Sequence, residues 1–282
     1  MRIYNHIFAL RKALARERFP KKTIGFVPTM GALHEGHLTL LRKCKKENDL
    51  SILSIFVNPA QFAPNEDFRR YPRNKKKDVL LANKEKVDIM FSPSVDEMYS
   101  RRYLTYVKVN RLSEFLCGKS RPGHFAGVAT IVAKLLNIVE PDVLYLGQKD
   151  AQQCRVLEQM IQDLNFPVKV KIIPTVRETD GLAMSSRNQS LSLRERKEAA
   201  ALYSILQEAK KKILQGEHQG QNITHFMQKM IFQKTSATID YAACVDAFSL
   251  EPLKVIQGKV LLALAVRFRK TRLIDNILVH VS

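Results

Sequence analysis

Short apolar runs alternate with segments of helical periodicity over the first 175 residues of the chain. Short continuous apolar runs are typical of strands buried in a parallel sheet, and apolar residues three and four positions apart predict a helix. The runs that predict strands are Ile24–Val27, Ser51–Val57, Asp88–Phe91, Val143–Leu146 and Val168–Pro174, with an alternating segment at Tyr103–Val109. The predicted helices are His6–Phe19, Leu38–Asn48, Lys75–Lys86 and Val128–Asn137. This alternation predicts an α/β fold with a parallel sheet.

The pattern changes after residue 175. Ser192 and Glu195 form the sequence of a capping box, which predicts the start of a helix that runs to Gln215. A second helix is predicted at Ile223–Gln233, followed by strands at Ile239–Asp246, Lys259–Phe268 and Leu273–Val281. Helices followed by consecutive strands without crossover helices indicate a separate α+β domain, so we expect domains at residues 1–175 and 176–282.

Composition indicates an ordinary folded protein. Hydrophobic residues make up 45% and charged residues 26% of the 282 positions, which excludes a disordered or fibrous chain. The four cysteines are scattered without C-x-x-C spacing and predict buried thiols in a reducing compartment. The N-terminal segment lacks the apolar core of a secretory signal, and no apolar run approaches the ~18 residues of a membrane span. We therefore expect a cytoplasmic protein that does not enter a membrane.

The formal net charge of +19 permits a nucleic acid, an anionic substrate or a generally basic proteome as its cause. The basic residues form separate clusters at 42–46, 75–77, 210–212 and 267–272, and not one stripe with interleaved aromatic residues. Solvated helix faces and loops explain most of this charge, so we do not expect a nucleic-acid partner.

The stretch Ile24–His37, with the sequence IGFVPTMGALHEGH, carries the main candidate chemistry. Its apolar run ends at Pro28 and Gly31, and helical spacing begins soon after, which predicts a strand, a tight turn and a helix start. The N–H groups and the positive dipole end of such a helix favour phosphate. His34 and His37 share one face if the helix has begun there, which suggests charge stabilisation in phosphoryl or nucleotidyl chemistry. A zinc site is the alternative, but no third ligand follows at a suitable distance.

The segment Gly147–Gln153, GQKDAQQ, is a second turn from a predicted strand into a predicted helix. Asp150 and Gln153 fit a helix-capping box, which would explain both residues without a ligand. Lys149 is not explained in this way, because a cation at a helix start opposes the helix dipole unless an anion lies between them. The sequence therefore favours a phosphate at this turn.

Several other polar loop residues have structural explanations beside functional ones. Gln61 follows the predicted strand Ser51–Val57, so its amide should lie at the same sheet edge as the histidines. Such an amide could bind a hydroxy acid substrate, or it could form hydrogen bonds with the loop backbone, and the sequence favours neither role over the other. His124 follows a Pro-Gly turn and is interpreted as structural. The hydroxyl-rich loop Met184–Asn188 precedes a helix, where serines usually serve as caps.

The chain carries five motifs in sequence: PTMGALHEGH from Pro28, FVNPAQF from Phe56, RPGHFAGVAT from Arg121, GQKDAQQ from Gly147 and DGLAMSSRN from Asp180. With these motifs in the family's order, the chain resembles the pantothenate synthetase (pantoate:β-alanine ligase) family along its whole length. This resemblance implies a Rossmann-like nucleotidyltransferase domain at residues 1–175, a smaller C-terminal α+β lid domain at residues 176–282, and a homodimer.

The resemblance implies a two-step ligase reaction. The carboxylate of pantoate attacks the α-phosphate of ATP to give pantoyl adenylate and pyrophosphate, and β-alanine then displaces AMP to form pantothenate, a precursor of coenzyme A. This chemistry needs alignment and charge stabilisation more than covalent help from the protein. Mg²⁺ is expected as the Mg-ATP complex, and no protein ligands to the metal are assigned.

The resemblance also implies roles for individual residues. Those assigned to ATP are Met30, Gly31, Ala32, Leu33, His34, Glu35, Gly36, His37, Gly147, Gln148, Lys149, Asp150, Val176, Met184, Ser185, Ser186 and Arg187. Within this set His34, His37 and Lys149 are catalytic, and His37 is the proton donor. Asp150 is assigned to the ribose and Val176 to the adenine. Gln61 and Gln153 match the amides that bind pantoate.

Two rival functions remain at this point. An aminoacyl-tRNA synthetase would suit the charge, but the chain is short for one, lacks an anticodon-type domain, and carries Gln61 and Gln153 where pantoate should bind. A basic nucleic-acid-binding module would bind RNA in a salt-sensitive manner without turning over ATP. We treat both as minor alternatives to the ligase.

Overall fold

The computed structural model describes residues 1–18, 22–63, 68 and 71–281, and the chain divides into two compact units. The first unit comprises residues 1–113, 121–148 and 153–174. The second comprises residues 114–120, 149–152 and 175–282. Two short segments from the first half of the chain, 114–120 and 149–152, therefore pack with the C-terminal residues.

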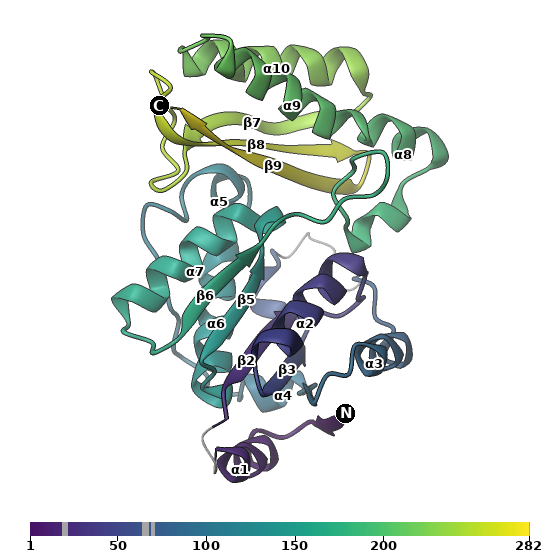
Figure 1. Ribbon diagram of the computed structural model, residues 1–282, viewed down its shortest axis with the longest axis vertical. Coiled ribbons are helices and arrows are strands. Elements are labelled where there is room, and N and C mark those ends of the chain that lie inside the picture. Colours follow the sequence, from purple (N-terminus) through teal and green to yellow (C-terminus); the bar gives the residue numbers. More distant parts are fainter. Residues whose placement is uncertain (19–21, 64–67, 69–70, 282) are drawn as a thin grey trace. The chain divides into compact units, whose positions relative to one another are not determined.

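The first unit is built on a six-stranded sheet in which all neighbouring strands are parallel (Figure 1). The strands are β1 (Arg2–Tyr4), β2 (Ile24–Thr29), β3 (Leu50–Ile55), β4 (Ile89–Phe91), β5 (Val143–Gly147) and β6 (Lys169–Ile173), in the order β1-β4-β3-β2-β5-β6. The chain steps outward from β2 to β3 and β4, and then returns to the other side of β2 with β5. This reversal creates a topological switch point at the carboxyl ends of β2 and β5, where open α/β sheets bind ligands.

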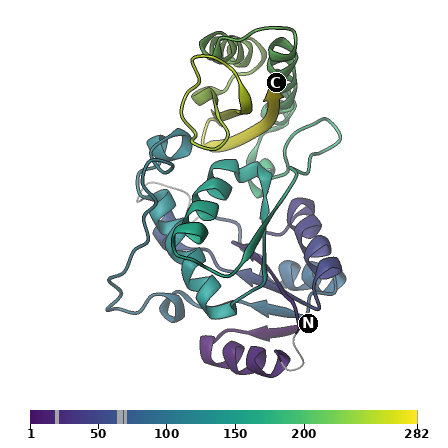
Figure 2. The ribbon, with the colours of Figure 1, turned by 60° about the vertical axis from the view of Figure 1, so that its left-hand side comes forward.

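Helices lie on both faces of this sheet (Figure 2). They are α1 (Ile7–Glu17), α2 (Glu35–Glu47), α3 (Lys75–Lys84), α4 (Val95–Met98), α6 (His124–Val139) and α7 (Ala151–Asp163). Leu41 and Cys44 of α2 pack with Val27 of β2 and Leu53 of β3 in one buried cluster. Strands covered on both faces need continuous apolar runs, which is why the sequence shows them without alternation.

The predicted strand at Tyr103–Val109 is wrong. The segment lies in the first unit, but it has no strand conformation. The backbone N–H of Val107 donates to the hydroxyl of Thr130 at 2.9 Å instead of to a neighbouring strand. Two of its apolar side chains, Leu104 and Tyr106, are exposed, whereas Val109 is buried.

The sequence pattern also fails to predict three short elements, β1, α4 and α5 (Leu116–Ser120). Each is too short to show a full period of apolar residues, and β1 owes its conformation to parallel pairing with β4. Phe19, the predicted end of the first helix, lies outside the described residues.

The second unit is an antiparallel sheet covered by helices. Its strands follow the order β7 (Thr238–Asp246), β8 (Gly258–Phe268) and β9 (Thr271–Val281). Helices α9 (Ala201–Leu214) and α10 (Gly220–Lys234) lie side by side on this sheet (Figure 1). Ile205 of α9 and Ile223 of α10 are fully buried in a cluster with Leu262 and Leu264 of β8. The predicted α/β fold with a smaller α+β part is confirmed.

The long helix predicted from Ser192 to Gln215 is instead two helices, α8 (Leu193–Ala199) and α9. The capping box of Ser192 and Glu195 at the start of α8 is present as predicted. The break falls at Ala200, whose φ of −61° and ψ of −25° remain in the right-handed helical region. Because the apolar period continues across this residue, the sequence does not reveal the interruption.

The cysteines behave as structural thiols. All four are buried and free, as their spacing predicts. Burial raises the pKa of Cys44 and of Cys244 to about 12, so neither thiol forms a reactive thiolate near neutral pH. Within the described ranges, the structure contains no helix that is long and apolar enough to cross a bilayer.

Candidate active site

A buried carboxylate fixes the turn between β2 and α2. Gly31 and Ala32 have φ values of 81° and 50°, and this left-handed conformation is unfavourable for a residue with a Cβ. Asp78 of α3 stabilises it, because its Oδ2 accepts from the Ala32 N–H at 3.1 Å and its Oδ1 from the Leu33 N–H at 2.8 Å. Asp78 is 2% exposed, so water competes little for these bonds. The Asp78 carboxylate therefore helps to shape this turn.

His34 and His37 cap the N-terminus of α2 with their side chains. His34 is the N-cap residue, and its Nδ1 accepts from the Gly36 N–H at 3.2 Å. In return, Nδ1 of His37 accepts from the His34 N–H at 3.4 Å, and the two ring centroids lie 4.1 Å apart. The rings satisfy N–H groups that a helix start leaves without intrahelical partners. The two imidazoles lie together because of this reciprocal capping; the helix begins only at Glu35, so the condition for the predicted shared helix face is not met.

These contacts determine which ring nitrogen carries the proton. A backbone N–H is a donor, so each Nδ1 presents its lone pair and the neutral ring is protonated at Nε2. In this form each imidazole can donate an Nε2–H to a phosphate oxygen. Glu35, between the histidines, forms an ion pair with Arg42 of the same helix. Among the described residues, no group of three or more His, Cys, Asp or Glu side chains is arranged to hold a metal ion.

The second predicted loop follows β5, which pairs with β2 in parallel. Gly147 at the end of β5 and Met30 after β2 therefore lie at the same edge of the sheet. The chain then forms the 3₁₀ helix η3 (Gln148–Asp150) and passes directly into α7, whose first turn contains the half-buried Gln153. Asp150 lies inside a helical turn, not in the extended conformation of an N-cap residue. The capping explanation for Asp150 and Gln153 stays a prediction, and the 3₁₀ conformation of Asp150 speaks against it.

Gln61 lies in the 3₁₀ helix η1 (Pro59–Gln61), and contacts hold both ends of its amide. Its Nε2 lies 2.8 Å from Sδ of Met30, and its Oε1 accepts from Nδ2 of Asn58 at 3.2 Å. Asn58 also donates to the carbonyl of Gly127 at 3.0 Å. A Cβ at Gly127 would clash with a backbone oxygen of η1, so glycine is what allows α6 to approach. The Gln61 side chain is thus preset beside the first loop.

His124 supports the backbone of the same loop. Its Nδ1 lies 2.8 Å from the carbonyl oxygen of Gln61, and Nη2 of Arg121 donates to that oxygen at 3.4 Å. This contact agrees with the structural interpretation of His124. The start of α6 therefore fixes the backbone of Gln61, while Asn58 fixes its side chain.

Other residues assigned to ATP belong to the second unit. The carbonyl oxygen of Lys149 accepts from Nδ2 of Asn276 at 2.9 Å, and its Nζ lies 3.8 Å from the carboxylate of Asp150. Val176 and Met184 are joined directly, because the Met184 N–H donates to the Val176 carbonyl at 3.0 Å. This backbone hydrogen bond therefore holds Val176, which is assigned to adenine, next to the start of the loop formed by residues 184–187.

Polar contacts also order the serine-containing loop, residues 184–187. The hydroxyl of Ser185 accepts from the Arg187 N–H at 3.3 Å and caps the 3₁₀ helix η4 (Ser186–Ser190). Asn188 donates to Oε1 of Glu178 at 2.8 Å, and Arg196 pairs with the other carboxylate oxygen of Glu178 at 2.6 Å. Capping is therefore one role of Ser185, and it fixes the backbone at Arg187.

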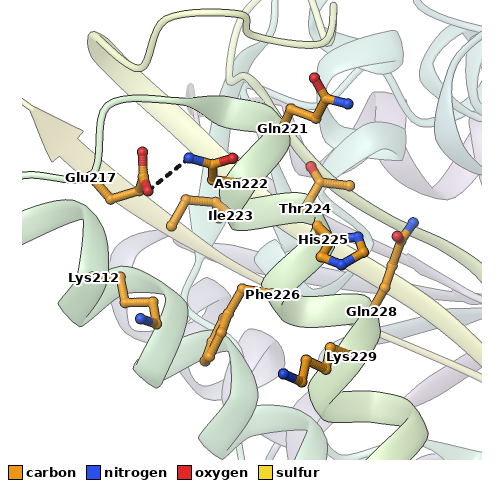
Figure 3. Close-up of a pocket in the computed structure, with 10 residues that line it drawn as sticks. All are labelled: Lys212, Glu217, Gln221, Asn222, Ile223, Thr224, His225, Phe226, Gln228 and Lys229. Atoms are coloured by element: carbon orange, nitrogen blue, oxygen red, sulfur yellow. Dashed lines mark hydrogen bonds between the residues drawn. The ribbon is translucent and has the colours of Figure 1, made fainter.

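A groove of about 830 Å³ in the second unit lies apart from these residues (Figure 3). It is lined by the end of α9 and by α10, with Lys212, Glu217, His225 and Lys229 among its residues. None of its lining residues is assigned to ATP or pantoate. Glu217 accepts from Nδ2 of Asn222 at 3.0 Å within this groove.

Sequence reasoning misses two residues that shape the site. Asp78 stands in the lysine-rich helix α3, and no local pattern distinguishes it from a solvated carboxylate, because its partners lie more than forty positions away in the chain. Asn58 lies in the motif FVNPAQF, three residues before Gln61. Its place in that motif is the signal that could have identified it.

Comparisons with known proteins identify the family. The family model for pantoate-beta-alanine ligase matches residues 2–278. The pantothenate synthetase of Caldicellulosiruptor saccharolyticus is 52% identical over 281 residues, which cover 100% of both chains. The crystal structure of pantothenate synthetase from Thermus thermophilus matches with a TM-score of 0.93 and 42% identity, covering 98% of this chain and 99% of that chain. Pantoate-beta-alanine ligase from Francisella tularensis, complexed with beta-gamma ATP and beta-alanine, matches with a TM-score of 0.80 and 35% identity, covering 99% and 97%. The chain belongs to the pantoate-beta-alanine ligase family, the pantothenate synthetases.

Proposed function

We propose that this chain condenses pantoate with β-alanine to form pantothenate, using ATP and passing through pantoyl adenylate. Membership of the family supports the overall reaction. The relative from Francisella tularensis, which was complexed with beta-gamma ATP and beta-alanine, supports the choice of nucleotide and amine. The observation that carries the adenylate route is the N-terminus of α2, where reciprocal capping through Nδ1 favours the Nε2–H tautomer of His34 and His37.

In the first step a carboxylate oxygen of pantoate bonds to the α-phosphorus of ATP, and the bond from that phosphorus to the pyrophosphate oxygen breaks. Negative charge builds up on the phosphate oxygens and on the leaving pyrophosphate. The dipole of α2 and the two Nε2–H groups can stabilise this charge, and His37 is the proposed proton donor. ATP enters as its Mg²⁺ complex, so the metal belongs to the substrate and neutralises part of the triphosphate.

The remaining nucleotide contacts follow from the chemistry of each side chain. The ammonium of Lys149 suits phosphate oxygens, and the carboxylate of Asp150 suits the hydroxyls of ribose. Val176 offers an apolar surface to adenine. Residues 184–187 contribute a guanidinium, hydroxyl groups and N–H groups to the triphosphate. The hydrogen bond between Val176 and Met184 supports this assignment, because it ties the proposed adenine contact to the proposed phosphate contacts.

Gln61 and Gln153 are the proposed pantoate ligands. An amide offers both a donor and an acceptor, which matches a substrate with two hydroxyls and a carboxylate. The fixed position of the Gln61 amide, between Met30 and Asn58, supports this role because little side-chain entropy remains to be lost on binding. In the second step the amine of β-alanine attacks the acyl carbon, loses a proton, and expels AMP.

We also propose a cytoplasmic homodimer formed through the first unit. Leu104 and Tyr106 of the irregular segment 103–109 are 88% and 65% exposed, which is unusual for large apolar side chains. A second copy of the chain would cover these side chains. Sedimentation equilibrium should therefore give twice the mass of the chain, whereas a monomer at micromolar concentration would contradict the proposal.

Oxygen-18 labelling of the pantoate carboxylate tests the adenylate route. The oxygen that bonds to the α-phosphorus leaves with AMP when β-alanine attacks the acyl carbon. Mass spectrometry should therefore find one labelled oxygen in AMP and none in inorganic phosphate. Label in inorganic phosphate, together with ADP, would show an acyl-phosphate route and would refute the proposal. Omission of β-alanine is the control, because labelled AMP should then not accumulate over repeated turnovers.

The Gln153→Ala variant tests the proposed pantoate contact. Loss of the amide should raise the KM for pantoate by a factor that corresponds to about 1–3 kcal/mol, because polar groups of the bound substrate lose their partner. The KM for ATP should change little. Gln159→Ala is the matched control, since Gln159 lies on the same helix and pairs with the exposed Asp163. Equal KM values for pantoate in both variants would remove Gln153 from the site.

A further inference from the structure

Strand β9 carries two adjacent polar residues in the interior of the second unit. Asp275 is 3% exposed and Asn276 is 5% exposed, and they pair across the sheet with Leu264 and Ala263 of β8. Burial of a carboxylate and an amide at such positions is unfavourable unless both find strong partners. Asp275 binds Arg177, which follows Val176, and Asn276 binds Lys149. Val176 and Lys149 are both assigned to ATP.

Asp275 anchors the segment that contains Val176. Both carboxylate oxygens accept from Arg177, at 2.7 and 2.9 Å, and the Arg177 guanidinium lies 3.7 Å from the ring centroid of Tyr203. Burial raises the pKa of Asp275 and the ion pair with Arg177 opposes this rise. A bidentate pair fixes the direction as well as the position of its arginine. The residue after Val176 is therefore immobilised on β9.

Asn276 anchors the segment that contains Lys149. Its Nδ2 donates to the carbonyl oxygen of Lys149 at 2.9 Å, and its backbone N–H donates to Oδ1 of Asp275 at 2.7 Å. One carboxylate oxygen thus joins the two anchors, because Oδ1 of Asp275 accepts from both Arg177 and Asn276. The backbone of Lys149 and the residue beside Val176 are tied to consecutive positions of a single strand.

We propose that Asn276 is a positioning residue, which sets the reach of the Lys149 ammonium toward the phosphates of ATP through the Lys149 backbone. Asp275 and Arg177 do the same for Val176, so β9 fixes the spacing between the phosphate contact and the adenine contact. This inference rests on the proposed nucleotide roles of Lys149 and Val176. The inference explains the spacing between Lys149 and Val176 by contacts with β9, which lies outside the motif GQKDAQQ.

A double-mutant cycle tests the proposal, because it isolates the coupling between two residues. Asn276→Ala should lower kcat/KM for ATP about ten- to hundredfold, since a displacement of about 1 Å at a catalytic group can cost that much. The KM for pantoate should stay unchanged. In a Lys149→Ala background, the same Asn276→Ala change should cost less than about twofold, because the group that it positions is already absent. An equal loss in both backgrounds would refute the proposal.

Controls separate positioning from a general loss of structure. Asn222→Ala removes the same side chain from α10 of the same unit, where Asn222 donates to the exposed Glu217 at 3.0 Å, and it should leave kcat/KM for ATP unchanged. If Asn276→Ala does not accumulate as folded protein, Asn276→Ser takes its place in the cycle. Calorimetric dissociation constants for ATP, measured without pantoate, repeat the cycle without the ligase reaction. If the proposed ligase reaction is wrong, the ATP dissociation constants alone still test whether Asn276 positions Lys149.

Discussion

The site of the first unit depends on the two hydrogen bonds that the Asp78 carboxylate accepts from the Ala32 and Leu33 N–H groups. Without them, a left-handed turn that includes a residue with a Cβ would lose its compensation. With them, the chain leaves β2 and enters α2 within a few residues, and the helix N-terminus lies at the edge of the sheet where the strand order reverses. The proposed phosphate site at this edge therefore depends on one buried carboxylate of a neighbouring helix.

Both units use buried polar side chains to hold segments next to the proposed site. Each places polar side chains in its interior, and these side chains hold neighbouring segments of the chain through hydrogen bonds to backbone or side-chain groups. Asp78 and Asn58 do so in the first unit, and Asp275 and Asn276 do so in the second. Buried polar groups of this kind are costly unless they are fully satisfied, and once satisfied they leave the loop a single conformation. The loops can then hold strained or polar conformations while the adjoining elements stay regular.

The sequence predicts those features of the structure that depend on residues close together in the chain. The buried strands and the capping box at Ser192 are local patterns, and the structure contains them. The segment 103–109 has a local pattern that its surroundings override, because Thr130 provides the partner for its backbone. The roles of Asp78 and Asn276 involve partners more than forty and more than one hundred positions away in the chain. Neither role leaves a periodic signal, so only the folded chain reveals it. The spacing of His34 and His37 predicts a shared face only if the helix begins at His34, whereas the helix begins at Glu35 and the rings meet because their Nδ1 atoms act as caps.

The central claim is that capping of α2 commits both histidines to the form that donates through Nε2. The most direct test is the ¹⁵N NMR spectrum of the imidazole nitrogens at mildly alkaline pH, with His34→Asn and His37→Asn variants to assign the signals. Asparagine is a good N-cap residue, so the His34→Asn variant should keep the helix start intact. The account predicts an unprotonated Nδ1 and a protonated Nε2 in both rings. A proton on Nδ1 of either ring would contradict it, because that nitrogen could not then accept from the backbone.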